Sequence, residues 1–209
     1  AVMSGAASLE SFVSGMKRET EPGTICQYNS ADTQALGLLL TYATGRSVTD
    51  YMQEKLFDPL GMEAAGYWLL DGEGMELVLG GLNLTARDFA KVGELYRNRG
   101  RLDGQQIVSE DWVTRSVTPS ADHMRAGNVI VGGHVFPFGY GYQWWVPAGE
   151  RGEFSAIGVY NQFVFVDPSR ALTMVKLSAN RAYGTSPDEA TNRETETVEF
   201  LRAIACGLD

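Results

Sequence analysis

Apolar residues in the first half of the chain recur at helical spacing. In segment 32–44 the apolar residues cover most of a helical circumference, and Gly45 follows the segment directly. These apolar residues are Ala35, Leu36, Leu38, Leu39, Leu40 and Ala43. This pattern predicts a buried helix that ends at the glycine. Three further segments with apolar residues at helical spacing each follow a residue that is typical of an N-cap, namely Ser47, Thr85 and Ser109. We therefore expect three more helices, which end near Gly61, Gly100 and Pro119.

The period changes in the second half. Segments 138–146, 161–166 and 172–177 are rich in aromatic and β-branched residues, which is the composition of strands. The run Asp167-Pro168-Ser169-Arg170 predicts a turn that joins the last two strands as an antiparallel hairpin. Segment 187–206 predicts a closing helix. Helices followed by antiparallel strands indicate an α+β fold.

Charge and composition narrow the function classes. The 209 residues have a formal net charge of -9, the wrong sign for neutralising phosphates or adhering to anionic lipid, so we expect no nucleic-acid partner. The chain holds no apolar run of membrane-spanning length, and we expect a soluble protein without a membrane span. It begins at Ala1 without a recognisable leader, which leaves the compartment open between bacterial-type cytoplasm and export.

Several common chemistries have no motif here. The chain has two histidines and no G-x-S-x-G, so a Ser-His-Asp triad is unsupported. It also lacks H-E-x-x-H, a P-loop and G-x-G-x-x-G. Cys26 and Cys206 show neither metal-ligand spacing nor a disulfide framework. We expect no metal and no cofactor.

One segment does carry a chemical signal. The run Pro22-Gly23-Thr24-Ile25-Cys26-Gln27-Tyr28-Asn29-Ser30 stands directly before the first long helix, and 44–47, 56–62, 80–88 and 165–168 follow it in order. Together these segments resemble the serine β-lactamase and penicillin-binding-protein superfamily, and within it the β-lactamase-like esterases and 6-aminohexanoate-oligomer hydrolases. The ordered similarity is more specific than any single motif.

By that resemblance Tyr28 is the catalytic tyrosine. A phenol has an ordinary pKa near 10, so it needs a cationic neighbour to take a proton from the nucleophile. The alternative is a half-buried aromatic residue at the start of the helix. Ser30 stands where the family often has asparagine, and two roles remain open for it: an orienting hydroxyl in the site, or the N-cap of the helix.

The family's nucleophile motif, S-x-x-K, has one match, Ser14-Gly15-Met16-Lys17. This match lies too close before Tyr28 for the family's order, and we interpret it as a chance pattern. The literal Y-x-N at Tyr96 is also interpreted as structural. We therefore expect the serine and lysine to be missing from this chain.

The family's third element, K-T-G or H-T-G on a strand, is absent in its literal form. Segment 155–160 takes its place, and the mechanism needs mainly a backbone N–H from it for the oxyanion. Ile157, Gly158 and Val159 are our candidates. Trp144 is a candidate wall of the substrate cleft, with a core position as the alternative. Loss of the basic residue weakens the case for β-lactam or peptidoglycan substrates.

The resemblance implies a β-lactamase/transpeptidase-like fold, an antiparallel sheet flanked by helices, with the N-terminal part of the domain absent. We expect residues 1–209 to be the C-terminal portion of one domain, mainly helical over 1–130, with strands and the terminal helix over 131–209. The predicted function is ester or amide hydrolysis of a small molecule through an acyl-serine intermediate, with this polypeptide alone inactive. The alternative is a non-catalytic homologue that serves as a binding module. Either would expose an apolar surface that favours association with itself or another chain.

Overall fold

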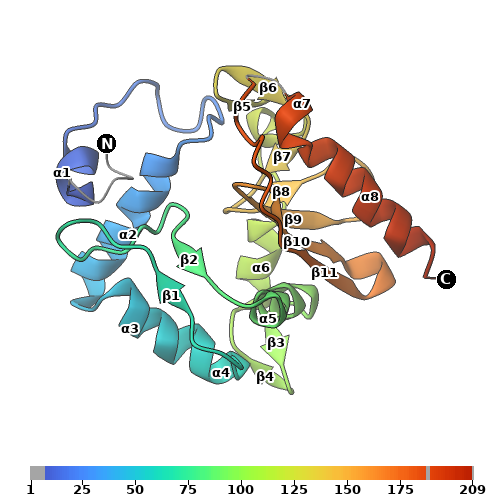
Figure 1. Cartoon of the computed structure of the whole chain (residues 1–209), viewed down its shortest axis with the longest axis horizontal. Coiled ribbons are helices and arrows are strands. Elements are labelled where there is room, and N and C mark those ends of the chain that lie inside the picture. The colour runs from blue at the N-terminus through green and yellow to red at the C-terminus, as the bar shows by residue number, and fades with distance from the viewer. Residues whose placement is uncertain (1–7, 187–188, 209) are drawn as a thin grey trace. The chain divides into compact units, whose positions relative to one another are not determined.

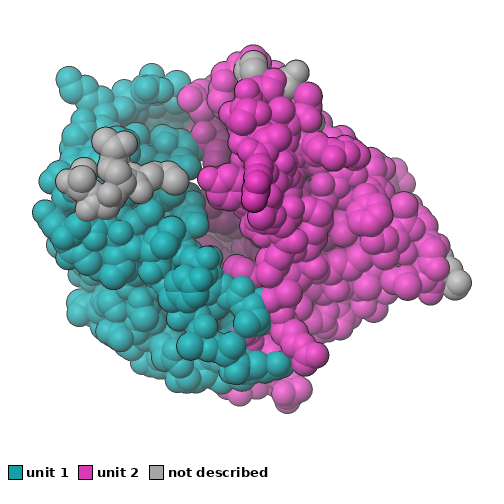
Figure 2. Space-filling view, viewed as in Figure 1, with its two compact units in different colours: residues 1–22, 29–85 teal, residues 23–28, 86–209 magenta. Residues whose placement is uncertain are grey.

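The computed structural model describes residues 8–186 and 189–208 of the chain. The chain divides into two compact units, which Figure 2 colours separately. Unit 1 comprises Ala1–Pro22 and Asn29–Thr85, and unit 2 comprises Gly23–Tyr28 and Ala86–Asp209. The short segment that ends in Tyr28 thus belongs to unit 2, although both of its neighbours in sequence belong to unit 1.

Unit 1 is mainly helical (Figure 1). Its elements are the helices α1 (Leu9–Ser14), α2 (Ser30–Thr44), α3 (Val48–Met52) and α4 (Asp58–Leu60), a π-helical turn (Gln53–Phe57) and an antiparallel pair of strands, β1 (Tyr67–Trp68) and β2 (Leu82–Asn83). The predicted helix ends are confirmed: Ser47 accepts a hydrogen bond from Asp50 N, and Gly45 and Gly61 take left-handed conformations at C-caps.

A polar network on the buried side of α2 links three segments of unit 1. Gln34 is fully buried and donates from Nε2 to the Glu76 carbonyl at 2.9 Å. The Glu76 carboxylate in turn accepts from Thr49 N at 2.9 Å and Thr49 Oγ1 at 2.6 Å. These bonds join α2, α3 and the loop between β1 and β2 without an unpaired donor at Gln34 or Thr49.

The prediction that α2 is buried on most of its surface is wrong for two leucines. Leu36 is 57% exposed and Leu39 is 63% exposed, whereas Gln34 and Gly37 face the interior. The interior positions were missed because one of them is a polar side chain whose partner, the Glu76 carbonyl, lies far away in sequence. The other is a glycine that lets Val78 approach the helix closely.

Unit 2 is built on a five-stranded antiparallel sheet with the order β11-β10-β9-β8-β7 (Figure 1). The sheet strands are β7 (Gly139–Tyr140), β8 (Trp145–Val146), β9 (Phe154–Gly158), β10 (Gln162–Asp167) and β11 (Leu172–Lys176). Two small hairpins stand beside it, β3 (Arg101–Leu102) with β4 (Gln105–Gln106) and β5 (Val129–Val131) with β6 (His134–Phe136). The helices are α5 (Ala86–Arg97), α6 (Glu110–Ser116), α7 (Glu189–Asn192) and α8 (Glu194–Cys206), with 3-10 turns at Asp122–Met124 and Pro168–Arg170.

The two faces of this sheet are covered by different helices. Phe163 and Phe165 of β10 pack in one core cluster with Val198 and Leu201 of α8. The alternate residues of β10 pack in a second cluster toward α5, together with Trp144 and Phe154. This is the period-2 alternation expected of a strand that is buried on both faces. The α+β fold predicted from the sequence is confirmed.

Two predicted elements are interrupted. Segment 138–146 is not one strand but two, β7 and β8, because Gln143 has a left-handed φ of 66° and turns the chain back. The closing helix is divided at Arg193, whose φ is 56°, and residues 187 and 188 lie outside the described part. The β5–β6 hairpin was not predicted. The predicted division into 1–130 and 131–209 stays a prediction. None of the described helices is long and apolar enough to cross a membrane.

Candidate active site

The backbone of Tyr28 is held by β5. Tyr28 N donates to the Ile130 carbonyl at 2.8 Å, and Ile130 N donates to the Cys26 carbonyl at 2.9 Å. Gln27 forms the corresponding parallel bridge with Ile130. The segment before α2 is therefore an added strand-like edge of unit 2, which fixes where the Tyr28 side chain begins.

The ring of Tyr28 lies in an aromatic group. It is half-buried and packs against Trp145 at 5.3 Å between ring centroids and, edge-on, against Tyr140 at 5.7 Å. Tyr140 and Trp145 are themselves 4.5 Å apart. Each pair lies within the distance range of favourable aromatic contacts. Sequence analysis missed both partners, although the aromatic run 138–146 was a visible signal.

Two other ionisable groups pack in the same cluster as Tyr28, the Tyr140 hydroxyl and the Cys26 thiol, and both are held in their neutral forms. Burial raises the pKa of Tyr140, and the neighbouring Tyr28 and Cys26 add to the effect. Tyr140 donates its hydroxyl proton to Gln143 Oε1 at 3.1 Å. Burial also raises the pKa of the Cys26 thiol. Neither Tyr140 nor Cys26 is suited to accept a proton near neutral pH.

Strand β9 has a complete strand partner on one side only. β10 pairs with it along its whole length, whereas β8 pairs with it at one position, Trp145 with Ser155. The left-handed Gln143 ends β8 before it can extend along β9. Among the described residues, the edge of β9 beyond Ser155 has no strand partner on the β8 side.

The turn before β8 establishes which way the neighbouring backbone groups point. Gly141 N donates to the Trp144 carbonyl at 2.8 Å, so the backbone of Trp144 faces β7. In an antiparallel sheet successive residues direct their N–H and C=O groups to opposite sides. The backbone of Trp145 therefore faces β9 and its partner Ser155.

The same alternation sorts the three oxyanion candidates. Since the backbone of Ser155 faces β8, the backbone of Ile157 faces the open edge. Val159 lies past the end of β9, in the turn, where this alternation no longer applies. Gly158 faces β10, where it pairs with Gln162. Strand pairing therefore favours Ile157 as the source of an N–H that faces the open edge and disfavours Gly158, while Val159 stays a prediction.

Trp144 and Ser30 occupy other surroundings. Trp144 is 5% exposed and packs against Tyr96 at 4.6 Å and Phe154 at 5.0 Å, in the core cluster toward α5. This is the core position that the sequence left open. Ser30 is the exposed first residue of α2 in unit 1. The N-cap is Asn29, whose Oδ1 accepts from Ala31 N at 3.0 Å, so the N-cap alternative for Ser30 is wrong.

The S-x-x-K match does not have the geometry of a nucleophile motif. Ser14 is the last residue of α1, Gly15 is its C-cap, and Lys17 follows outside the helix. The serine and lysine are therefore not brought together on one helical turn. This agrees with the interpretation of the match as a chance pattern.

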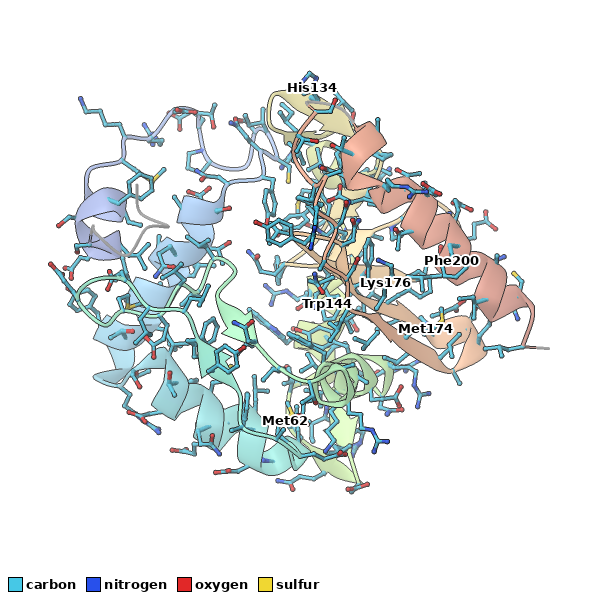
Figure 3. The ribbon with its side chains drawn as sticks, viewed as in Figure 1. Met62, His134, Trp144, Met174, Lys176 and Phe200 are labelled. Atoms are coloured by element: carbon cyan, nitrogen blue, oxygen red, sulfur yellow. The ribbon has the colours of Figure 1, made fainter. Side chains whose placement is uncertain are left out.

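Metal-binding clusters and the histidines add no second site. Among the described residues, no group of three or more His, Cys, Asp or Glu side chains could hold a metal ion. His134 is exposed at the outer end of the β5–β6 hairpin (Figure 3).

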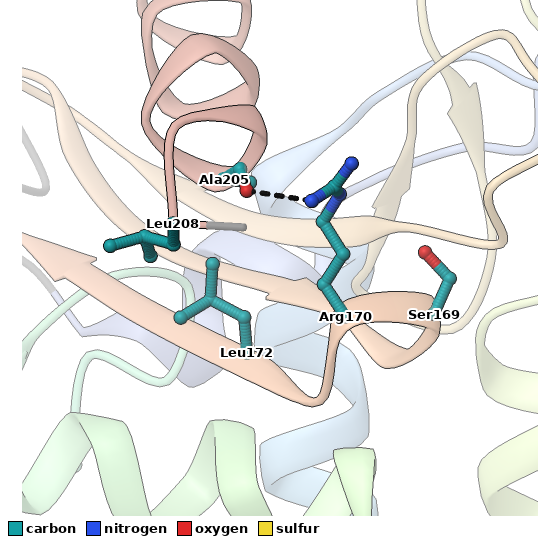
Figure 4. Close-up of a pocket in the computed structure, with 5 residues that line it drawn as sticks. All are labelled: Ser169, Arg170, Leu172, Ala205 and Leu208. Atoms are coloured by element: carbon teal, nitrogen blue, oxygen red, sulfur yellow. Dashed lines mark hydrogen bonds between the residues drawn. The ribbon is translucent and has the colours of Figure 1, made fainter.

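A pocket with a cavity volume of about 340 Å³ lies at the other end of β10. Figure 4 shows its lining, Ser169, Arg170, Leu172, Ala205 and Leu208. Arg170 donates from Nη1 to the Ala205 carbonyl at 2.9 Å, near the C-terminus of α8, where a cation is favourable. Because Leu172 pairs with Asp167, at the opposite end of β10 from Gln162, this pocket is separate from the open edge of β9.

Comparison with known proteins gives one consistent family. The family model described as Beta-lactamase matches residues 2–198. A 6-aminohexanoate-dimer hydrolase from Paenarthrobacter ureafaciens is 30% identical over 154 residues, which are 73% of this chain and 39% of that protein. Among solved structures, a Bacillus anthracis protein with the provisional name 6-aminohexanoate-dimer hydrolase matches 96% of this chain and 48% of its own, with a TM-score of 0.80 and 27% identity.

A more distant solved structure has the same fold. A penicillin-binding protein homologue from Caulobacter crescentus is 14% identical, with a TM-score of 0.62, and the match covers 82% of this chain and 57% of that one. The chain spans less than half the length of the two 6-aminohexanoate-dimer hydrolases.

Proposed function

Because this chain belongs to the beta-lactamase family, we propose that it forms part of a serine hydrolase that cleaves ester or amide bonds through an acyl-serine intermediate. The relatives named above as 6-aminohexanoate-dimer hydrolases support hydrolysis as the reaction class. The observation that carries the proposal is the placement of Tyr28, with its backbone bonded to β5 and its ring packed against Trp145.

In this proposal Tyr28 transfers the proton. Its phenolate oxygen accepts the proton of the serine hydroxyl during acylation, and the hydroxyl formed in this way returns the proton to the leaving group. A phenol with an ordinary pKa near 10 does this at neutral pH when a cation stabilises the phenolate. The aromatic packing against Trp145 and Tyr140 orients the ring, and the neutral Tyr140 and Cys26 do not compete for the proton.

The open edge of β9 supplies the second requirement. An acyl transfer develops negative charge on the carbonyl oxygen, and a backbone N–H directed at that oxygen stabilises it. Ile157 is the candidate donor whose backbone faces the side of β9 that β8 leaves open, and Val159, in the turn after β9, is the second candidate. Any residue type can supply such a donor, so the missing K-T-G does not prevent this role.

We assign neither nucleophile nor lysine to a residue of this chain, because Ser14 and Lys17 do not share a helical turn. The relatives extend well beyond the matched part, and we propose that the reactive serine belongs to a segment of that kind. Substrate identity follows only as a class, a small ester or amide.

A fluorophosphonate probe tests the proposal, since it labels activated serines. We expect it to label the complete gene product and not the 209-residue chain. The chain alone should not turn over p-nitrophenyl acetate, and Ser14→Ala should change nothing. Turnover by the chain that Ser14→Ala abolishes would overturn the assignment of the nucleophile. Absence of labelling in both proteins would instead favour a non-catalytic binding module.

A further inference from the structure

The turn between β9 and β10 has an unusual backbone. Tyr160 and Asn161 are consecutive residues with φ values of 62° and 68°, in the left-handed region. Asparagine tolerates this region well, but an aromatic residue there has a strained backbone. Such strain persists only where the surroundings enforce it, and it is common at ligand-binding positions.

The carbonyl groups of this turn are held from both sides. Gln162 Nε2 lies 3.2 Å from both the Val159 and the Tyr160 carbonyl oxygens. Lys176 Nζ donates to the Asn161 carbonyl at 3.2 Å, and Asn180 N donates to that of Tyr160 at 3.3 Å. The backbone of the turn is therefore fixed by donors from β10, β11 and the segment after β11.

The side chain of Asn161 anchors the turn a second time. It is 3% exposed, its Oδ1 accepts from Asn180 Nδ2 at 2.6 Å, and its own amide donates to the Asn192 carbonyl. Asn180 Nδ2 also donates to the Thr191 carbonyl at 2.7 Å. A buried amide with these partners stabilises one conformation of the turn.

The fixed turn presents two apolar side chains outward. Tyr160 is 53% exposed and Val159 is 57% exposed. The Tyr160 ring packs edge-on against Tyr183 at 6.0 Å, and Tyr183 is itself oriented by donating its hydroxyl to Glu194 Oε1 at 2.6 Å. An exposed aromatic residue on a strained backbone whose carbonyl groups are bonded is not explained by backbone preference, since glycine or asparagine would suit the positive φ better.

We propose that Val159 and Tyr160, supported by Tyr183, form an apolar lip that binds an uncharged apolar substituent on the acyl side of the scissile bond. The inference rests on the hydrolase function proposed above. Val159 and Tyr160 directly follow Gly158, the last residue of β9, so a carbonyl group bonded by the Ile157 N–H at the open edge would have the lip two residues further along the chain. Lys176, the cation that is bonded to the turn, donates to the Asn161 carbonyl.

A binding experiment tests the lip without requiring catalysis. The ¹⁵N-labelled 209-residue chain is titrated with N-methyloctanamide, an uncleaved amide with an apolar acyl chain, and in parallel with N-methylacetamide. We expect saturable shifts of the Val159, Tyr160 and Tyr183 amide signals with the octanamide and none with the acetamide at the same concentration. Tyr160→Gly should weaken the apparent binding by about fivefold, the size of one aromatic contact, and Tyr160→Phe should preserve it.

The controls separate this inference from the proposed function. Glycine suits a positive φ, so Tyr160→Gly keeps the turn, and unchanged amide signals of β10 and β11 will show this. Absence of shifts, or equal shifts in the wild type and Tyr160→Gly, would overturn the lip. Shifts at the lip in a protein whose complete form never reacts with the fluorophosphonate would support the lip and overturn the hydrolase proposal.

Discussion

Tyr28 packs against Trp145 with their ring centroids 5.3 Å apart and their planes inclined by 34°. One residue ends the segment before α2, and the other begins β8, so the contact joins two distant parts of the sequence within unit 2. The tyrosine is therefore positioned by the sheet, and this placement makes its hydroxyl testable apart from its ring.

Replacing Tyr28 by phenylalanine removes the hydroxyl and keeps the ring against Trp145. In a form of the protein that hydrolyses p-nitrophenyl acetate, we expect Tyr28→Phe to lower kcat by about 10²–10⁴-fold with little change in KM, the effect of losing a general base. Tyr140→Phe is the matched control, because Tyr140 stays protonated, and it should retain most of the activity. Equal losses in the two variants would argue against Tyr28 as the base.

Proline at position 159 removes the backbone N–H of Val159, one of the two candidate oxyanion donors. We expect Val159→Pro to lower kcat by about 10²–10³-fold in the active form, the effect of losing one oxyanion donor. Val159→Ala keeps the N–H and should retain kcat. Circular dichroism will show whether the proline variant is folded. A folded Val159→Pro variant with full activity would assign the donor role elsewhere, with Ile157 as the next candidate.

Gly93 lets α5 pack directly on the sheet. A Cβ at this position would lie 2.6 Å from Thr173 Cγ2 and 2.9 Å from Val164 Cγ1. We expect Gly93→Ala to lower the free energy of unfolding by about 1–3 kcal/mol through overpacking, measured by urea denaturation. Gly207→Ala is the control, since a Cβ there meets only ordinary contacts of 3.6 Å. A neutral Gly93→Ala would mean that α5 can shift away from β10 and β11.

Arg202 neutralises a buried carboxylate. It is bonded to Glu153, which is 3% exposed, and to the Ala148 carbonyl at 2.8 Å. Arg202→Met leaves that charge unpaired, and we expect a loss of about 3–5 kcal/mol in the free energy of unfolding. Arg125→Met breaks an exposed ion pair with Asp122 and should cost less than about 1 kcal/mol. Similar losses in both variants would show that burial of Glu153 does not govern the energy.

Asp71 gives unit 1 a pH dependence. Burial raises the pKa of this carboxyl, but hydrogen bonds from backbone N–H groups outweigh it and hold the pKa below its ordinary value of about 3.8; the donors are Leu9, Met75, Glu73 and Gly74. A pKa lowered by folding means that the stabilisation is present above the unfolded-state value and is lost as the pH falls through the folded-state value.

Asp71→Asn should therefore lower the free energy of unfolding by about 1–3 kcal/mol at pH 7, since one acceptor oxygen becomes a donor facing the Leu9 N–H. The difference between wild type and variant should shrink below about pH 4. Urea denaturation from pH 7 to pH 2.5 measures both. A difference that stays constant over this range would contradict the lowered pKa.

Local signals predicted much of this fold. Ser47 and Ser109 cap helices as expected. The β10–β11 hairpin also follows, with Asp167 accepting from Arg170 N at its turn. These features depend on neighbouring residues, whose preferences can be read directly from the chain.

The candidate site was predictable only in part. The family resemblance selected Tyr28 and segment 157–159 as candidates, and their roles stay predictions. The contact with Trp145 and the orientation of the Ile157 N–H depend on strand pairing and on the left-handed Gln143, which no local pattern indicates. Leu36 and Leu39 show that periodicity predicts a helix at α2 but does not reveal which of its faces is buried.

Because segment 23–28 belongs to unit 2, it also affects the order in which the chain can fold during synthesis and the fragments into which it can be cut. Ribosomes release Tyr28 long before Ile130, so the final strand-like edge of unit 2 must wait until all of unit 1 and β5 have been synthesised. Such a late, long-range closure is slow in folding, because loop-closure entropy is lost before the contact forms. It also means that no single cut between the units yields a complete unit 2: a fragment starting at Ala86 would leave behind the residue that we propose as its base.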